Sequence, residues 1–220
     1  MIPSYLKQDI LCLDTETSVL GDHVCEIGFT LFRNTEQVSS WNSFVKPGIP
    51  INPEATKIHN IKNEDVENSP SFNDLSWFIY NNMNAADFWC MYNADYDIGV
   101  LKKEFERLGM KLPPKYVIDP FILFKRWHKF NKGKKLVNAA ETCGIPYVGA
   151  HRAGNDAAVT GRVLFKIAAT RTDFPKTIVD YVKKQRKWCE EQFEDLQAYF
   201  VKVGRGPIDK PNYAFYEGIY

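Results

Sequence analysis

Residues 9–17 read Asp9-Ile10-Leu11-Cys12-Leu13-Asp14-Thr15-Glu16-Thr17, a short apolar run followed by two acidic residues. We expect a buried strand over residues 9–14, with the acids at its end. Asp14 and Glu16 are one residue apart, so in an extended chain both carboxylates point to the same side. Two like charges on one face repel unless a cation lies between them, and hard divalent cations prefer carboxylate oxygen. An Asp-x-Glu pair is also common in solvated turns, so the metal interpretation depends on acids later in the chain.

The composition is that of an ordinary globular protein. The chain has 220 residues, of which 45% are hydrophobic and 25% charged, and its formal net charge is +1. A charge so close to zero means that any contact with nucleic acid must come from local patches. The 5 cysteines are dispersed and form no C-x-x-C pair, which favours a reducing compartment over a structural zinc site. Without a signal-like N-terminus or an apolar stretch of membrane-spanning length, we expect a cytoplasmic protein and no membrane partner.

The order of strand and helix patterns predicts an α/β fold. Apolar runs predict further strands over residues 24–32, 41–45, 88–92 and 116–118, and the first three strands should form an antiparallel meander. Helical spacing predicts helices over 71–82, 119–129, 136–143 and 153–169, another that ends at Leu108, and a long one capped by Asp173 that runs to about Val203. This order predicts a mixed five-stranded sheet flanked by helices, with a C-terminal helical extension. We expect residues 1–171 to form the main domain and residues 172–220 a helix and an aromatic-rich tail.

Two further acids lie at the ends of apolar elements later in the chain. Asp97 lies in the first turn of the helix after the strand at 88–92, and Asp156 opens the long helix at 153–169. With Asp14 and Glu16 they make four acids, enough to hold two divalent ions roughly 4 Å apart, as in enzymes that attack phosphodiesters in line. His151 lies on the loop before Asp156, where a neutral imidazole can accept the proton of an attacking water.

These residues fall in three motifs that resemble the DnaQ-like 3′–5′ exonucleases of the DEDDh group. The first motif, D-x-E-T, is similar to Asp14–Thr17; the second, H-N-A-x-F-D, to Tyr92–Asp97; and the third, H-x-A-x-x-D, to His151–Asp156. The second motif selects Asp97 over its neighbour Asp95. Between the motifs, Ile58–Ile61 looks like the family's I-H-G-I segment and Glu26–Gly28 like its E-I-G strand, so the resemblance covers about residues 9–170.

The resemblance implies a ribonuclease-H-like fold, two Mg²⁺ or Mn²⁺ ions, and stepwise release of nucleoside 5′-monophosphates from a 3′ end. It implies that the metal ligands are Asp14, Glu16, Asp97 and Asp156, and that His151 is the general base. The groups around Thr15 and Thr17 would hold the terminal nucleotide, with His59 and Asn93 as further substrate contacts. The family continues its first motif as T-T-G-L, whereas here Thr17-Ser18-Val19-Leu20 follows. The missing glycine leaves open whether Val19 or Leu20 wedges against the terminal base, and Leu20 is the predicted contact.

Within the family, the Ile58–Ile61 segment and the third motif look most like the branch of the polymerase III epsilon subunit. This likeness implies a proofreading or repair exonuclease that acts on DNA 3′ ends and works with a DNA polymerase or another replication or repair protein. An RNA-trimming enzyme like ribonuclease T or oligoribonuclease is the alternative, because sugar discrimination depends on contacts around the 2′ position. A non-catalytic nucleic-acid-binding module is an alternative of another class, but it predicts a replaced catalytic residue, and all five are present.

Two further segments have open interpretations. Residues 125–135 are basic and include Trp127 and Phe130. The simplest interpretation is a solvated face, and the alternative is a track for a nucleic-acid backbone with an aromatic side chain that stacks on a base. The aromatic-rich tail at 205–220 is expected to pack back onto the domain, and the alternative is that it docks a partner.

Overall fold

The structure, a computed structural model, describes residues 1–210 and is built around a five-stranded sheet of order β3-β2-β1-β4-β5. The strands are β1 (Ile10–Val19), β2 (Asp22–Arg33), β3 (Glu36–Phe44), β4 (Phe88–Cys90) and β5 (Tyr116–Ile118). The first three strands pair antiparallel, whereas β4 and β5 continue the sheet from β1 in parallel. The predicted mixed sheet is therefore confirmed.

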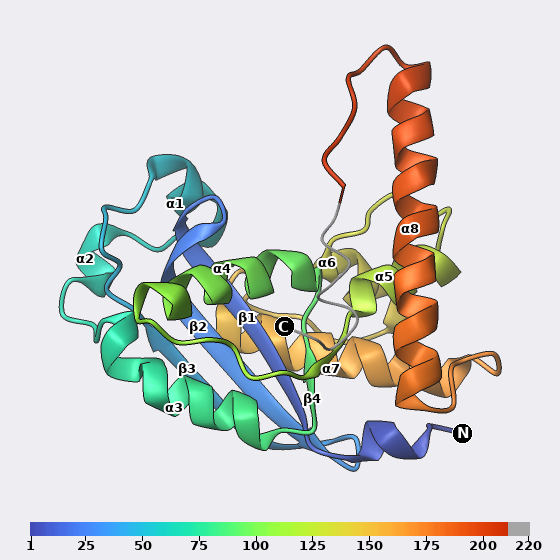
Figure 1. Cartoon of the computed structure of the whole chain (residues 1–220), viewed down its shortest axis with the longest axis horizontal. Coiled ribbons are helices and arrows are strands. Elements are labelled where there is room, and N and C mark those ends of the chain that lie inside the picture. The colour runs from blue at the N-terminus through green and yellow to red at the C-terminus, as the bar shows by residue number, and fades with distance from the viewer. Residues whose placement is uncertain (211–220) are drawn as a thin grey trace.

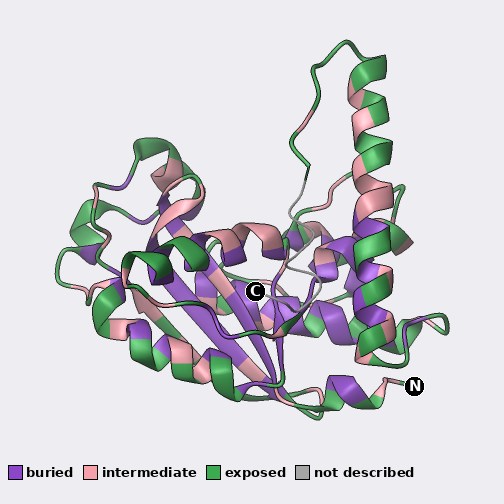
Figure 2. Ribbon diagram, in the orientation of Figure 1, coloured by how far each residue is buried: buried purple, intermediate pink, exposed green. Residues whose placement is uncertain are grey.

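Helices cover both faces of this sheet. They are α1 (Pro53–His59), α2 (Asn63–Val66), α3 (Phe72–Ala85), α4 (Ala94–Arg107), α5 (Pro120–Trp127), α6 (Leu136–Cys143), α7 (Ala153–Thr170) and α8 (Ile178–Lys202), after a short 3₁₀ turn at Ser4–Lys7. Figure 1 shows α3 and α4 in front of the sheet and α7 behind it. The strands between these layers are largely buried, as Figure 2 shows, so the core lies on both sides of β1 and β2.

Two strands extend five residues beyond their predicted bounds, whereas β2 gains three residues and β4 ends two residues early, at Cys90. β1 continues past Asp14 to Val19, so the two acids lie inside the strand and not at its end. β3 begins at Glu36 and not at Trp41, after a two-residue turn in which Asn34 and Thr35 have φ of 54° and 70°. Residues 36–40 are exposed, so this half of β3 lacks the apolar alternation that marks a half-buried strand.

Helix α8 is joined to the sheet by its N-terminal half. The amide of Gln185, which is fully buried, accepts from the backbone N–H of Asp119 at 2.8 Å and donates to the carbonyl of Val117 at 2.9 Å. The helix begins after Thr177, whose hydroxyl caps it by accepting from the N–H of Asp180, so the predicted cap at Asp173 is wrong. The end of α8 projects away from the domain (Figure 1). The tail aromatics Tyr213, Phe215, Tyr216 and Tyr220 lie outside the described residues, and among residues 1–210 no helix is both long and apolar enough to cross a membrane.

Gly28 on β2 lets helix α7 lie close to the sheet. A Cβ atom at this position would lie 2.2 Å from the backbone nitrogen of Gly154 and 2.5 Å from the carbonyl carbon of Ala153. Both neighbours are backbone atoms, so no rotamer change can make room for a side chain. Gly28 therefore fixes the distance between β2 and the first turn of α7, which carries Asp156.

We expect Gly28→Ala to lower the free energy of unfolding by about 1–3 kcal/mol, the usual effect of overpacking. Activity should also fall, because the first turn of α7 has to move away from β2. Chemical denaturation measures the first effect. Gly99→Ala is the matched control: a Cβ there meets nothing within 4 Å, and alanine should stabilise helix α4 by up to about 1 kcal/mol. Equal stability of the two variants would contradict the close contact.

Candidate active site

Strand β1 supplies two carboxylates and two buried threonines in alternation. Asp14 pairs with Gly28 and Glu16 with Glu26 in the ladder with β2, while Thr15 and Thr17 are buried. The period-two alternation of a strand places both acids on one side of the sheet, as the sequence predicts.

Asp97 reaches β1 from the first turn of α4. It is only 3% exposed, and its Oδ1 accepts both the backbone N–H of Thr15, at 2.9 Å, and the hydroxyl of Thr15, at 2.7 Å. The start of α4 is fixed in turn by Asp119, whose carboxylate accepts from the backbone N–H groups of Asn93 and Ala94 at 3.0 Å each. Thr15 thus orients Asp97, and its predicted contact with the terminal nucleotide stays a prediction.

Asp156 and His151 arrive from the start of α7. Asp156 is buried, whereas His151 is exposed and has a left-handed φ of 63°. One ligand atom each from Glu16, His151 and Asp156 lies within 4.8 Å of the other two. The Tyr147 hydroxyl donates to Asp156 Oδ1 at 2.6 Å, a contact that the sequence pattern does not reveal.

Burial raises the pKa of all four carboxyl groups. For Asp14 and Glu16 the negative charges of neighbouring acids, including Asp97 and Asp156, raise it further, and the pKa of Glu16 reaches about 8. The pKa of Asp97 is raised to about 7, although the hydrogen bonds from Thr15 partly oppose the shift. The pKa of Asp156 is also raised, against the opposing effect of the Tyr147 hydrogen bond. Crowded carboxylates of this kind are stabilised either by protons or by a cation.

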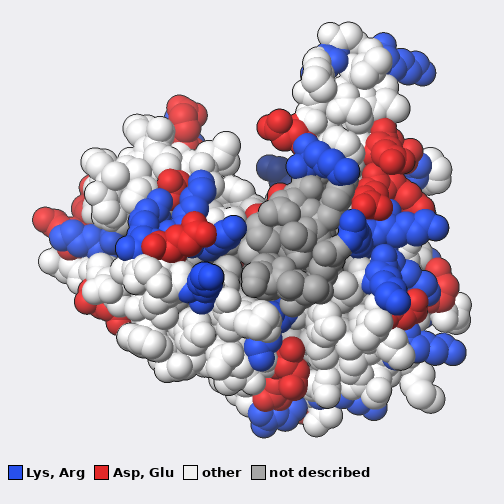
Figure 3. Space-filling model, viewed as in Figure 1, with Lys and Arg blue, Asp and Glu red and all other residues white. Residues whose placement is uncertain are grey.

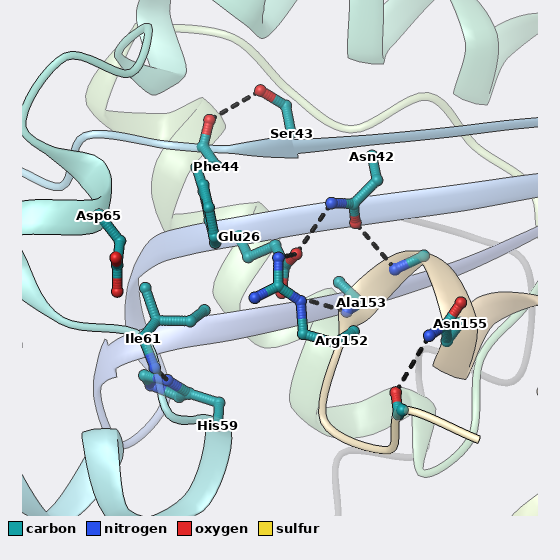
Figure 4. Close-up of polar contacts among 12 residues, drawn as sticks. Glu26, Asn42, Ser43, Phe44, His59, Ile61, Asp65, Arg152, Ala153 and Asn155 are labelled. Carbon is teal, nitrogen blue, oxygen red and sulfur yellow. Dashed lines mark hydrogen bonds and ion pairs between the residues drawn. The ribbon is translucent and has the colours of Figure 1, made fainter. Parts of the chain in front are cut away.

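A buried acid on β2 holds the start of α7 in place (Figure 4). Glu26 is fully buried and pairs with Arg152 at 2.8 Å, while accepting from the side-chain amide of Asn42 and the backbone N–H of Ala153. Asn42 in turn accepts from the backbone N–H of Gly154 at 2.9 Å. Since these partners occupy Glu26, we assign it to holding the third motif rather than to binding metal.

The remaining predicted contacts surround a cavity of about 310 Å³ beside Glu16. Thr17, Leu20 and His59 line it, together with Val19 and Tyr96. His59 is buried, and its Nδ1 accepts from the N–H of Ile61, so Nε2 is left to donate to the carbonyl of Thr17 at 3.2 Å. Asn93 is exposed and is not among the residues that line this cavity.

The basic segment 125–135 is largely engaged in holding α5 and α8 together. Arg126 pairs with Glu191 and Lys129 with Asp195, and Trp127 stacks on Phe174. Basic and acidic side chains are accordingly intermixed over α8 in Figure 3. Phe130, by contrast, is 96% exposed. These contacts favour a structural role for most of the segment over a nucleic-acid track.

The chain was compared with known families and proteins. Residues 11–164 match the RNase_T family, described as "Exonuclease". The 3′-5′ exonuclease DinG of Staphylococcus aureus is 30% identical over 196 residues, which are 89% of this chain but 21% of the relative, so the chain spans about a fifth of that protein.

Solved structures share the fold. Exonuclease X in complex with 5′ overhanging duplex DNA is 24% identical, with a TM-score of 0.60 over 73% of this chain and 92% of that one. The nuclease domain of 3′hExo, a DEDDh family member bound to rAMP, is 18% identical, with a TM-score of 0.64 over 76% of this chain and 94% of that one. The E. coli exonuclease I complex with a dT13 oligonucleotide is 15% identical, with a TM-score of 0.69 over 81% and 44% of the two chains. The predicted resemblance to exonucleases is confirmed: the chain has a ribonuclease-H-like fold and belongs to the exonuclease family.

Proposed function

We propose that this chain is a metal-dependent 3′–5′ exonuclease that removes nucleoside 5′-monophosphates from DNA 3′ ends. The observation that carries this proposal is the grouping of Glu16, His151 and Asp156, with Asp14 and Asp97 near enough to interact with these acids electrostatically. Asp97 is hydrogen-bonded to β1 through Thr15, and Glu16 meets Asp156 and His151 within 4.8 Å.

The residues fit a pair of Mg²⁺ or Mn²⁺ ions. Hard oxygen ligands predominate in the cluster, and burial raises the pKa values of its carboxyl groups, further raised for Asp14 and Glu16 by neighbouring negative charges, so a divalent cation would offset their repulsion. Asp14, Glu16, Asp97 and Asp156 would hold the two ions, whose chemistry when bound would be to activate water and to stabilise charge on the phosphate oxygens.

His151 is the proposed general base. An imidazole nitrogen accepts the proton of the attacking water, whose oxygen bonds to phosphorus while the bond to the 3′ oxygen of the preceding nucleotide breaks. His151 is exposed, so a scissile phosphate could approach its imidazole. Thr17, Leu20 and His59 would contact the terminal nucleotide, with Asn93 and the backbone of Thr15 as further candidates.

DNA is the proposed substrate, with RNA as the second candidate. Exonuclease X and exonuclease I were solved with DNA, which supports the first choice, whereas 3′hExo was solved with rAMP. The non-catalytic binding module has no support, because none of the five catalytic residues is replaced.

Organisation and location are part of the proposal. We divide the chain into an exonuclease domain over residues 1–171 and an appended helix and tail over residues 172–220, in line with the family match over residues 11–164. A cytoplasmic location is in keeping with the five cysteines, which are buried and unpaired. A polymerase or another replication or repair protein as partner stays a prediction.

A matched pair of substitutions tests the ligand assignment. Asp97→Asn should lower kcat by at least about 100-fold, the lower end for removal of one electrostatic group from a transition state. Asp95→Asn, a neighbour on the same helix turn, should stay within a few-fold of the original protein. Release of mononucleotides from a single-stranded oligonucleotide gives both values. A large loss in Asp95→Asn and none in Asp97→Asn would reverse the assignment.

Substrate class follows from parallel assays on single-stranded DNA, duplex DNA and RNA of one sequence. We expect the highest kcat/KM on DNA with a frayed or single-stranded 3′ end, and complete loss of activity in chelator. Degradation that persists in chelator, or in Asp97→Asn, would contradict the metal mechanism. Faster degradation of RNA would move the assignment to the second candidate.

Ion binding should stabilise the fold more at high pH than at low pH. The pKa of Glu16 rises from 4.5 to about 8 on folding and that of Asp97 from 3.8 to about 7, so the metal-free fold binds extra protons in this window. Its stability therefore falls as pH rises through these values. A divalent ion that takes the protons' place should raise Tm by roughly 5–10 °C at pH 8, for an ion at about 100 times its Kd.

Thermal unfolding in chelator and in Mg²⁺ or Mn²⁺, at pH 5 and pH 8, measures this effect. Asp14→Asn is the control, because it removes one ligand and should shrink the ion-dependent rise. An equal rise at both pH values would contradict the proposed exchange of protons for ions.

A further inference from the structure

The tip of the β1–β2 hairpin is bonded to helix α4 at Gly21, next to the ion pair of Asp22 with Arg107. Leu20 and Gly21 form the turn between β1 and β2, and Gly21 has a left-handed φ of 71°. Its N–H donates to the hydroxyl of Tyr96 at 3.1 Å, and its carbonyl accepts from the ammonium of Lys103 at 2.8 Å. Both polar groups of one turn residue are thus bonded to the helix that carries Asp97.

Tyr96 also binds the end of the first motif. Its hydroxyl lies 2.6 Å from Thr17 Oγ1, so one phenol oxygen joins the strand, the turn and the helix. The second motif of the family has phenylalanine at this position, which lacks that oxygen. The same hairpin also lacks the glycine of the family's first motif: Val19 stands at that position, between the two residues that bond to the Tyr96 hydroxyl.

The residue that this arrangement presents is Leu20. Its side chain is 90% exposed at the tip of the hairpin and borders the cavity of about 310 Å³, together with Thr17 and Tyr96. A volume of this size is at the lower end of small-ligand pockets, about 300–1,000 Å³. An exposed leucine on a free two-residue turn would move, whereas the bonds to Gly21 hold its backbone in place.

We propose that Tyr96, supported by Lys103, is a positioning residue that holds Leu20 as a fixed wedge against the 3′-terminal nucleobase. The inference deepens the proposed function, because it concerns how the same site recognises the end of its substrate. Contact between an apolar side chain and a base depends on the base and not on the phosphate chemistry. The effect of Tyr96 should therefore appear only when the terminal nucleotide carries a base.

The test compares two oligonucleotides, identical except that one has an abasic 3′-terminal residue. Full burial of one leucine side chain corresponds to a factor of roughly 10–150 in affinity. We expect Tyr96→Phe to raise KM about 10-fold for the oligonucleotide with the normal end, with kcat nearly unchanged. For the oligonucleotide with the abasic end, KM should change less than about 2-fold. Leu20→Ala should give the same pattern, and the double variant should be no worse than Leu20→Ala alone.

Two controls separate positioning from general damage. Tyr5→Phe removes another phenol oxygen, bonded to the carbonyl of Pro175 away from this site, and should leave both substrates unaffected. Lys103→Met removes the second bond to Gly21 and should raise KM on the normal end alone, by less than Tyr96→Phe. Equal losses on both ends, additive losses in the double variant, or no loss in Tyr96→Phe would overturn the inference.

Binding of the same oligonucleotides in chelator, followed by fluorescence anisotropy, gives the readout without the reaction. If the original protein cleaves neither DNA nor RNA with Mg²⁺ or Mn²⁺ present, the proposed function fails. The wedge is then judged from binding alone. It requires that Tyr96→Phe bind the normal oligonucleotide more weakly than the original protein does, and that the two proteins bind the abasic oligonucleotide equally well.

Discussion

Mutual repulsion among partly buried carboxylates is the constraint to which the rest of this structure responds. Asp14 and Glu16 lie on one strand, and their carboxylates repel each other. Burial and the charges of Asp97 and Asp156 raise the pKa values of both groups. The scaffold opposes the repulsion in two ways. Asp97 and Asp156 lie in the first turns of α4 and α7, where the helix dipole favours negative charge. Each helix start is also fixed by a buried acid, Asp119 for α4 and Glu26 for α7.

These two fixing acids differ from the four acids of the cluster in their partners. The carboxylate of Asp119 accepts three backbone N–H groups, and that of Glu26 meets an arginine, an amide and a backbone N–H. A buried acid with its hydrogen-bonding capacity filled supports the fold, whereas an acid whose neighbours are other acids has capacity for an external cation. The sequence alone does not distinguish a structural acid from a metal-binding acid, because the difference lies in the hydrogen-bond partners.

The sequence predicted the parts of the site that depend on local order. Alternation along β1 placed Asp14 and Glu16 together, and the position of Asp156 at a helix start followed from the pattern around it. The same reasoning failed where the signal is absent: the exposed first half of β3 has no apolar alternation, and the end of β1 carries acids that resemble a strand boundary. Contacts such as Glu26 with Ala153, which are 127 residues apart, could not be predicted from spacing at all. The basic segment at 125–135 is a related case, because its charges are paired across to α8 by a distant part of the chain.

Two departures from the family pattern, Val19 for glycine and Tyr96 for phenylalanine, are best considered together in this chain. A missing glycine in the first motif makes the hairpin conformation doubtful, and a tyrosine for phenylalanine in the second motif appears conservative. In space the two changes lie on one hairpin, since the added hydroxyl bonds to Thr17 and Gly21, on either side of Val19, which stands at the glycine position. The left-handed φ of 71° in this turn belongs to Gly21, and the Tyr96 hydroxyl fixes the backbone N–H of that same residue. The hydrogen bond also connects the turn to α4, the helix that carries Asp97.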